Sequence, residues 1–532
     1  MNIVYVKNKK NGITYVYEST NYWDKDKKQS RSKRVCIGKL DEKGNLIPSK
    51  RLTEPSVSTV VKRGPVPSVS TRHSYYGASY LFDAIGEELG VTQDLKVCFP
   101  ESYKQILSVA YFLILEDRNS LIRFPKWDRT HYHPHGSCIS SQRSSDLFTS
   151  ITEEAKGRFF RLQGKRRMEN EYWAYDTTSI SSYSESLKQV KYGMNKDHDP
   201  LPQINLALLF GQDSGLPFYF RKLAGNISDV KTLKKLLADL KSLDYGKVKL
   251  VMDRGFYSED NINALYQSNL KFLISAKVSL KLVQKELDKV RDSIRTRINY
   301  NSTYQLYTHS TTVEWNYSQK RPQKGDVIKD TRRMYLHIYF NSEKALEHES
   351  RFNEMLDMLE SELTTGNRKP ENEKQYAKYF DITETPVRGI KIAPKQDAIT
   401  KAEKDYGFFA LMSNEIKDPI KALETYRNKD LVEKAFGNLK ERLNLRRTAV
   451  SSESSLDGKL FVQFVALIYM SYLKKKMSEE NLFQNYTMQE LLDELDVIEA
   501  FENPGNALRV GEVTKKQEEL YKTLGINPPT TL

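Results

Sequence analysis

The spacing of apolar positions divides the chain into regions with a strand pattern and regions with a helix pattern. Residues 1–50 alternate β-branched or aromatic residues with polar ones, which predicts a short β-meander. Residues 51–72 are rich in Pro, Ser and Thr and predict a linker, so that 1–72 forms an N-terminal β-rich segment with its linker. A helical module is expected over 73–168. Its apolar residues recur every three or four positions near 77–90, 102–116 and 140–160.

Residues 169–280 then switch to strands that alternate with helices. The expected strands cover 172–180, 204–210, 217–223, 248–252 and 272–276. The expected helices cover 229–243 and 259–267. This order of elements predicts an α/β fold with a mixed sheet that is flanked by helices.

Residues 281–400 interrupt that pattern and are expected to form an inserted α+β module. The module is expected to contain a charged helix over 345–363, strands over 303–309 and 334–340, and a polar stretch at 365–377. Residues 401–503 resume the fold and add C-terminal helices, before a tail at 504–532 that is expected to be loosely ordered. The expected elements there are a strand over 408–412, a helix from about 418 to 442, and helices over 457–476 and 487–500.

Charge adds a candidate partner to this outline. The net charge of +14 favours a polyanion such as nucleic acid, although a basic soluble protein without such a partner has the same composition. The helical module ends in the run Lys165, Arg166 and Arg167, so 73–168 is a candidate DNA-binding domain. A helical scaffold with a solvated charge run is the alternative.

Cysteine content and the apolar stretches bear on the compartment. Three cysteines far apart in the sequence argue against a disulfide framework and favour a reducing compartment. The longest apolar stretches, 106–115 and 461–473, are shorter than the ~20 residues that span a bilayer and predict buried helices. The N-terminus has no signal-peptide pattern, so we expect a cytoplasmic protein without a membrane partner.

Two aspartates follow apolar strands and are candidates for catalysis. Asp176 ends the apolar run of the strand 172–180, and Asp253 directly follows the strand 248–252, where Gly255 permits a sharp exit. Each aspartate alone is weak evidence, because Asp often ends a strand as a turn or cap residue.

The helix expected over 418–442 carries the third candidate carboxylate. Tyr426, Glu433 and Lys440 are spaced by seven residues and share one face, and Lys429 lies four residues before Glu433 on the same face. A solvated face with ordinary charge pairs is the alternative interpretation. Carboxylates suit Mg²⁺, and nearby cations offset the charge that develops on a phosphate, so these residue types favour phosphodiester chemistry.

The whole set resembles bacterial insertion-sequence transposases of the DDE class, in the subgroup with a Tyr-x2-Arg-x3-Glu-x6-Lys helix. Tyr426, Lys429, Glu433 and Lys440 keep that spacing, with Lys429 where the family has Arg, and Arg427 is a candidate substitute. Further segments that resemble the family lie at 175–178, 225–229, 253–257 and 406–409.

The resemblance implies an RNase H-like fold with an insertion before the Glu-bearing helix. It implies that Asp176, Asp253 and Glu433 hold two Mg²⁺ or Mn²⁺ ions, and that Lys440 lies near a terminal phosphate. The residues expected to contact DNA are Tyr426, Lys429, Lys440, Arg254 and Arg427. The implied reaction is cleavage at terminal inverted repeats and transfer of the freed 3′-hydroxyl into target DNA. The expected setting is a homodimeric synaptic complex on the nucleoid.

Other interpretations remain open. The chain can be a catalytically silent DNA-binding relative or repressor, or an RNase H-like nuclease without strand transfer. The cluster His131, His133, His135 and Cys138 contains zinc-ligating residue types, but its spacing with Pro134 and Gly136 predicts a loop. Asp229 is expected to cap its helix and not to bind metal. Trp127 and Trp173 are expected in the core.

Overall fold

The computed structural model contains two compact units, residues 1–70 and 71–532. The described residues are 2–24, 29–49, 72–116, 120–167, 171–246, 248–320, 326–385, 389–448, 450, 452–503 and 507–530. The linker expected at 51–72 lies outside the described residues except for Arg72.

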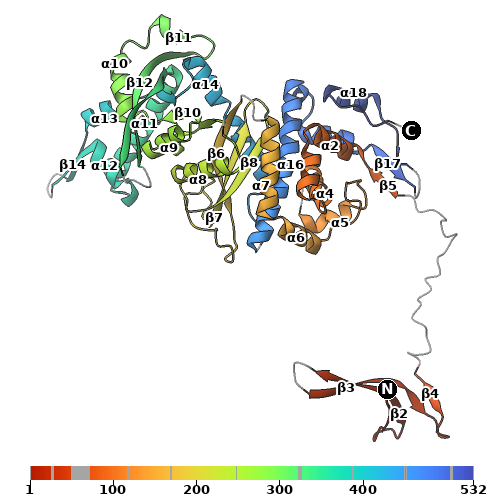
Figure 1. Cartoon of the computed structure of the whole chain (residues 1–532). Coiled ribbons are helices and arrows are strands. Elements are labelled where there is room, and N and C mark those ends of the chain that lie inside the picture. Colours follow the sequence, from red (N-terminus) through yellow and green to blue (C-terminus); the bar gives the residue numbers. More distant parts are fainter. Residues whose placement is uncertain are drawn as a thin grey trace. The chain divides into compact units, whose positions relative to one another are not determined.

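The first unit is a four-stranded antiparallel sheet in which the strands follow one another in chain order (Figure 1). Its strands are β1 (Asn2–Lys7), β2 (Thr14–Asp24), β3 (Gln29–Leu40) and β4 (Leu46–Pro48). The meander expected over 1–50 is confirmed. Gly12 and Gly44 have positive φ angles of 68° and 83° in the turns before β2 and β4, where a residue without Cβ avoids strain.

A nine-stranded mixed sheet forms the centre of the second unit, with helices packed along it (Figure 1). Its order is β11-β12-β13-β16-β10-β9-β6-β7-β8. Six strands match the expected positions to within one residue at each end. They are β6 (Tyr172–Ser181), β7 (Gln203–Gly211), β8 (Pro217–Ala224), β9 (Lys249–Met252), β10 (Lys271–Ala276) and β16 (Phe408–Ser413). The mixed α/β sheet flanked by helices is therefore confirmed.

The region 281–400 differs from its expectation. The strands β12 (Leu306–Lys320) and β13 (Val327–Phe340) are longer than expected and join the large sheet beside β16, so they do not belong to a separate module. Only the second half of β13 is buried, which explains why its strand pattern was recognised over 334–340 alone. The remaining elements enclose a small core of their own. They are α11 (Ser342–Thr364), α12 (Glu373–Tyr379), β14 (Phe380–Thr385), β15 (Gly389–Pro394) and α13 (Gln396–Glu403).

Helices before β6 pack around one long central helix. They are α2 (Gly77–Glu88), α3 (Val91–Cys98), α4 (Tyr103–Leu115), α6 (Ser141–Ser150) and α7 (Glu153–Arg167). The single helix expected near 140–160 is thus two helices. The central helix α16 (Glu453–Glu479) packs against α4 and α6. It is long and apolar enough to cross a membrane, but 89% of its apolar window is buried, so it is a core helix of this fold.

The C-terminal tail is more ordered than expected. The helix expected over 487–500 ends early as α17 (Met488–Asp496), and β17 (Glu499–Glu502) follows and pairs with β5 (Arg72–Tyr75). The helix α18 (Lys515–Thr523) buries Tyr521 completely, and its hydroxyl donates to the Gly77 carbonyl at 2.8 Å. The tail therefore closes on the start of the second unit. Trp127 and Trp173 are buried, as expected.

Candidate active site

Two parallel strands bring the candidate aspartates together. β6 and β9 pair in parallel, and their last paired residues are Tyr175 and Met252. Asp176 and Asp253 are the next residues on each strand, so they stand side by side where β9 ends. β6 itself continues to Ser181, which confirms the strand expected over 172–180 and places Asp176 within it. The end of β9 leaves that side of Asp176 without a neighbouring strand.

The carboxylate of Asp253 is fixed by two hydrogen bonds. Its Oδ1 accepts from the Arg254 backbone N–H at 2.7 Å, which begins the short 3₁₀ helix η2 (Arg254–Phe256). The same oxygen accepts from the Tyr426 hydroxyl at 2.9 Å. Burial and the negative charge of Asp253 raise the pKa of Tyr426, so the phenol stays protonated and acts as a donor. Tyr426 is thereby a positioning residue for Asp253.

The prediction of one continuous helix over 418–442 is wrong. It is divided into α14 (Pro419–Arg427) and α15 (Asp430–Glu441). At the junction the Lys429 N–H donates to the Tyr426 carbonyl at 3.1 Å, and the Val432 N–H donates to the Lys429 carbonyl at 2.9 Å. These bonds reach back three residues and tighten the turn locally. Tyr426 therefore belongs to one helix and Glu433 to the next.

Lys429 lies between two of the candidate carboxylates. Its Nζ is 2.7 Å from Glu433 Oε1 and 3.9 Å from Asp176 Oδ2, and its side chain is only 5% exposed. Burial lowers the pKa of Lys429, but Glu433 and Asp176 outweigh that effect and leave it raised. The lysine is consequently charged and holds Glu433 toward Asp176.

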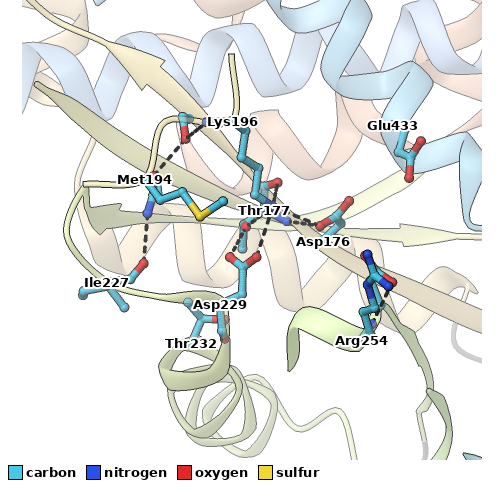
Figure 2. Close-up of polar contacts among 12 residues, drawn as sticks. Asp176, Thr177, Met194, Lys196, Ile227, Asp229, Thr232, Arg254 and Glu433 are labelled. Atoms are coloured by element: carbon cyan, nitrogen blue, oxygen red, sulfur yellow. Dashed lines mark hydrogen bonds and ion pairs between the residues drawn. The ribbon is translucent and has the colours of Figure 1, made fainter. Parts of the chain in front are cut away.

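Asp176 is largely but not fully buried; burial raises the pKa of its carboxyl group, while Lys196 and Lys429 oppose that rise. Lys196 comes from the loop between β6 and β7, and Figure 2 shows its side chain extending to Thr177 beside Asp176. Its Nζ donates to the Thr177 carbonyl at 2.6 Å and lies 3.5 Å from Asp176 Oδ1. Lys196 was missed in the sequence because nothing in the loop pattern marks it.

Asp229 contradicts its expected role as a helix cap. Ser228 is the N-cap residue of α8 (Asp229–Ser242), and the Asp229 carboxylate turns toward β6 instead. It accepts a hydrogen bond from the Thr177 hydroxyl at 2.5 Å and pairs with Lys196 at 3.3 Å (Figure 2). Side chains alternate between the faces of a strand, so Thr177 faces α8 while Asp176 faces α15. Asp229 thus supports the site from the opposite face of β6.

The remaining residues expected to bind DNA have different partners in the structure. Lys440 is held by Asp197, with Nζ to Oδ2 at 2.6 Å. Arg254 is exposed and directly follows Asp253 in the chain. Figure 2 draws it at the right of the view, below Glu433. Arg427 instead lies over the Tyr304 ring at 5.0 Å, so the structure does not place it in Lys429's position.

The donor set fits a hard divalent cation. Three carboxylates come from adjacent strands and the facing helix, and the ammonium group of Lys429 already lies between two of them as a cation would. Within the described part of the chain, no three His, Cys, Asp or Glu side chains are grouped closely enough to hold one ion. Asp176, Asp253 and Glu433 would therefore have to move closer together to hold a metal, and Lys429 would have to leave its position between Asp176 and Glu433.

The histidine cluster has ordinary structural partners. His131 Nε2 lies 3.0 Å from Asp496, and His133 Nε2 lies 2.9 Å from Asp128. In the basic run at the end of the helical module, Arg166 forms an ion pair at 2.6 Å with Asp94, which is almost fully buried. Arg166 is therefore engaged in an ion pair within the protein.

The family to which the chain belongs is shown by comparison with known protein families. A family model described as a transposase DDE domain matches residues 173–470, which include all three candidate carboxylates and more than half of the chain. Among solved structures, the chain is similar to a piggyBac transposase synaptic complex with hairpin DNA, studied by cryo-EM. The identity is 10% and the TM-score 0.32, over 78% of this chain and 70% of that chain. No curated protein matches the chain.

Proposed function

The chain belongs to the transposase DDE domain family, and from that premise we propose that it cleaves DNA at the ends of a bacterial insertion sequence. The freed 3′-hydroxyl then attacks target DNA. Asp176, Asp253 and Glu433 are the proposed catalytic residues. The observation that carries this proposal is the convergence of two adjacent parallel strands and α15, with Lys429 between the carboxylates.

Divalent metal supplies the Lewis acid that activates the attacking oxygen and stabilises the leaving oxygen, and we propose two Mg²⁺ or Mn²⁺ ions. The protein's own part is to hold two carboxylates on a rigid sheet and a third on the helix α15 that faces it. Tyr426 orients Asp253 through its hydroxyl, and Lys196 with Asp229 steadies the segment around Asp176. These residues act through the carboxylates and are positioning residues.

Cations near the site suit the DNA backbone. Lys440 lies in the last turn of α15, seven residues after Glu433, and is paired with Asp197, whose side chain is about half exposed. We propose that a terminal phosphate replaces Asp197 as the partner of Lys440, because both are oxygen anions. Arg254 and Lys429 would offset the charge that develops on the scissile phosphate. Tyr426 and Arg427 are the other two residues that we propose to contact DNA.

Further parts of the proposal concern fold and setting. The order β8-β7-β6-β9-β10, with three antiparallel strands followed by two parallel ones, supports an RNase H-like catalytic domain. In this proposal the helices over 73–168 contact DNA, and elements between β13 and β16 form the insertion. Synapsis of two element ends requires a homodimer, working on the nucleoid in the cytoplasm.

The test is cleavage of a supercoiled plasmid that carries the inverted repeats flanking this gene. Full-length protein is incubated with Mg²⁺ or Mn²⁺, and Asp253→Ala is compared with Asp260→Ala, an exposed aspartate on α9 (Glu259–Gln267). We expect Asp253→Ala to lower the cleavage rate by about 10³-fold, which is about 4 kcal/mol of lost transition-state stabilisation. Asp260→Ala is expected to cleave like the wild type.

The products separate the competing functions. Joined products between element ends and target DNA support transposition. Cleavage without joining indicates a nuclease, and specific binding without cleavage indicates a silent relative or repressor. Equal background cleavage by the wild type and Asp253→Ala would contradict the enzymatic proposal.

A further inference from the structure

The N-terminal sheet has a large exposed surface for its size. Among its described residues only Val16, Ser19 and Gly38 are buried. Large apolar side chains that are at least partly open to solvent occur on all four strands. They include Ile3, Tyr5, Tyr22, Trp23, Val35, Leu46 and Ile47. A sheet of this kind is held together by few core contacts and offers its side chains to a partner.

Positive charge is concentrated in the sequence segment that contains this sheet. Residues 1–50 contain 12 Lys and Arg against 5 Asp and Glu, which gives a net charge of +7. This is half of the +14 of the whole chain of 532 residues. The charge complements a polyanion, and duplex DNA is the polyanion that the proposed function supplies.

Part of the sheet is a two-stranded ribbon. β1 pairs with β2 only over 14–19, and β4 pairs with β3 only over 38–40. Beyond these limits, residues 20–23 of β2 and 30–33 of β3 pair only with each other, and we call these eight residues the ribbon. The B-DNA major groove is about 12 Å wide and admits a two-stranded β-ribbon.

Both faces of the ribbon carry side chains of types that contact DNA. Residues paired directly across an antiparallel ladder share a face. One face presents Tyr22 opposite Arg31 and Thr20 opposite Lys33. The other presents Trp23, Asn21, Ser30 and Ser32, with Arg34 at its base opposite Ser19. Arginine, lysine, asparagine and hydroxyl groups all contact phosphates, and arginine, lysine and asparagine also read base edges in the major groove.

We propose that the ribbon, together with Arg34, docks in the major groove of duplex DNA and anchors the chain there. This deepens the proposed function, because it assigns DNA binding to a part of the chain outside the helical module. It does not depend on catalysis, since the sheet belongs to a different compact unit from the carboxylates.

Binding of a labelled mixed-sequence duplex of about 30 bp to full-length protein in EDTA tests the proposal without cleavage. The ribbon variant Arg31→Gln/Lys33→Gln/Arg34→Gln is compared with Lys9→Gln/Lys10→Gln/Lys43→Gln, which removes the same charge from turns of the same sheet. We expect the ribbon variant to lose at least about tenfold in affinity near 100 mM salt. Its slope of log K against log salt should fall by about 2–3, since each phosphate contact contributes about 0.9.

Equal losses in the two variants would overturn the proposal, because long-range charge alone would then explain binding. Tighter binding of single-stranded DNA than of duplex by the wild type would also overturn groove docking. A sheet that instead joins two copies of the chain would show a DNA-independent dimer that the ribbon variant dissociates, and this result too would contradict the proposal.

The fluorescence of Trp23 reports directly on whether the ribbon is covered. Of the four tryptophans it is 63% exposed, whereas Trp127, Trp173 and Trp315 are 2%, 1% and 6% exposed. Acrylamide quenching therefore reports mainly on Trp23, and DNA should protect it. The signal should vanish in Trp23→Phe. Unchanged quenching at saturating DNA would contradict docking by the ribbon.

The proposed function and this inference can fail separately. If the ribbon variant binds weakly but the wild type never cleaves, the transposase proposal fails and the ribbon remains. If the wild type cleaves and the ribbon variant binds like the wild type, the ribbon inference fails alone.

Discussion

The two principal sheets of this protein differ in what they bury. Every residue of β7 in the nine-stranded sheet is buried, and β6 beside it is buried except at Tyr172 and Asp176, which are partly exposed. In the four-stranded N-terminal sheet, β1 has no buried residue. One sheet packs helices along it, and the other presents aromatic and basic side chains to solvent.

This difference separates two tasks. A strand that is packed on both faces cannot shift easily, so Asp176 and Asp253 keep their positions for chemistry. A sheet with a small core contributes little stability, but its exposed side chains are available to a large charged partner. We therefore expect substitutions in the large sheet to change catalysis or folding, and substitutions in the small sheet to change DNA affinity.

The largest expected effect is on catalysis. Glu433→Gln is expected to lower the cleavage rate by about 10³-fold, because an amide neither carries charge nor suits Mg²⁺ as a carboxylate does. Glu441→Gln is a matched control, since both glutamates lie on α15 and both are 59% exposed. The measurement is the single-turnover rate on plasmid DNA. Equal rates for the two variants would remove Glu433 from the site.

The next effect concerns stability. Leu250→Ala, at a fully buried position on β9, should lower the free energy of unfolding by about 3 kcal/mol through lost contacts and a cavity. Ile3→Ala, at a position 58% exposed on β1, should change it by less than about 0.5 kcal/mol. Urea unfolding is followed by far-ultraviolet circular dichroism, which reports on both units, and by tryptophan emission, which reports mainly on the second unit, where three of the four tryptophans are buried. Similar losses in both variants would contradict the contrast.

Lys429 tests the departure from the family motif. Lys429→Gln leaves Asp176 and Glu433 without their shared cation and should lower the cleavage rate by about 30-fold, which is about 2 kcal/mol. Lys429→Arg keeps the charge and should stay within about threefold of the wild type. Lys434→Gln, on the exposed side of α15, is the control. An unchanged rate for Lys429→Gln would show that the buried lysine is only structural.

The smallest expected effect is a pH dependence of stability. Burial on α2 raises the pKa of Asp83 from 3.8 to about 6, although the Tyr111 hydroxyl donates to it at 2.8 Å. The folded state thus binds this proton more tightly than the unfolded state. The resulting stability is complete below about pH 4 and is lost as the pH rises through about 6.

Asp83→Asn should therefore stabilise the protein by about 1–2 kcal/mol at pH 8 and have little effect at pH 4. In the N-terminal sheet, the pKa of Asp41 is shifted in the opposite direction to that of Asp83, because a hydrogen bond from the Asn45 backbone lowers it. Asp41→Asn should give no stabilisation at pH 8. Thermal unfolding across this pH range checks both variants, and a pH-independent effect of Asp83→Asn would contradict the account.

The sequence predicted the strands around the site well, because buried strands have unbroken apolar runs and Asp253 follows one of them. It did not predict the junction at Lys429. Tyr426, Glu433 and Lys440 have the spacing of one continuous helix, and a local tightening of three residues leaves that periodicity intact. The full lengths of β12 and β13 were also missed. The first half of β13 is exposed and mostly polar, whereas in β12 the buried Val313, Trp315 and Tyr317 alternate with exposed residues.

Long-range contacts explain what else the sequence could not predict at the site. Lys196 reaches Asp176 from a loop 20 residues away, and Asp229 meets Thr177 across 52 residues. An aspartate at the start of a helix is usually a capping residue, and only the position of β6 shows that Asp229 turns elsewhere. The charge of the N-terminal segment was visible in the sequence, but the position of Arg31 and Lys33 on a two-stranded ribbon required the strand register.

The most direct test of the division between the two sheets is the single-turnover cleavage rate as a function of protein concentration. The account predicts that Asp253→Asn abolishes the plateau rate while still binding DNA. It predicts that the ribbon variant reaches the wild-type plateau at a concentration higher by about tenfold. A lower plateau for the ribbon variant, or a wild-type plateau for Asp253→Asn, would contradict the central claim.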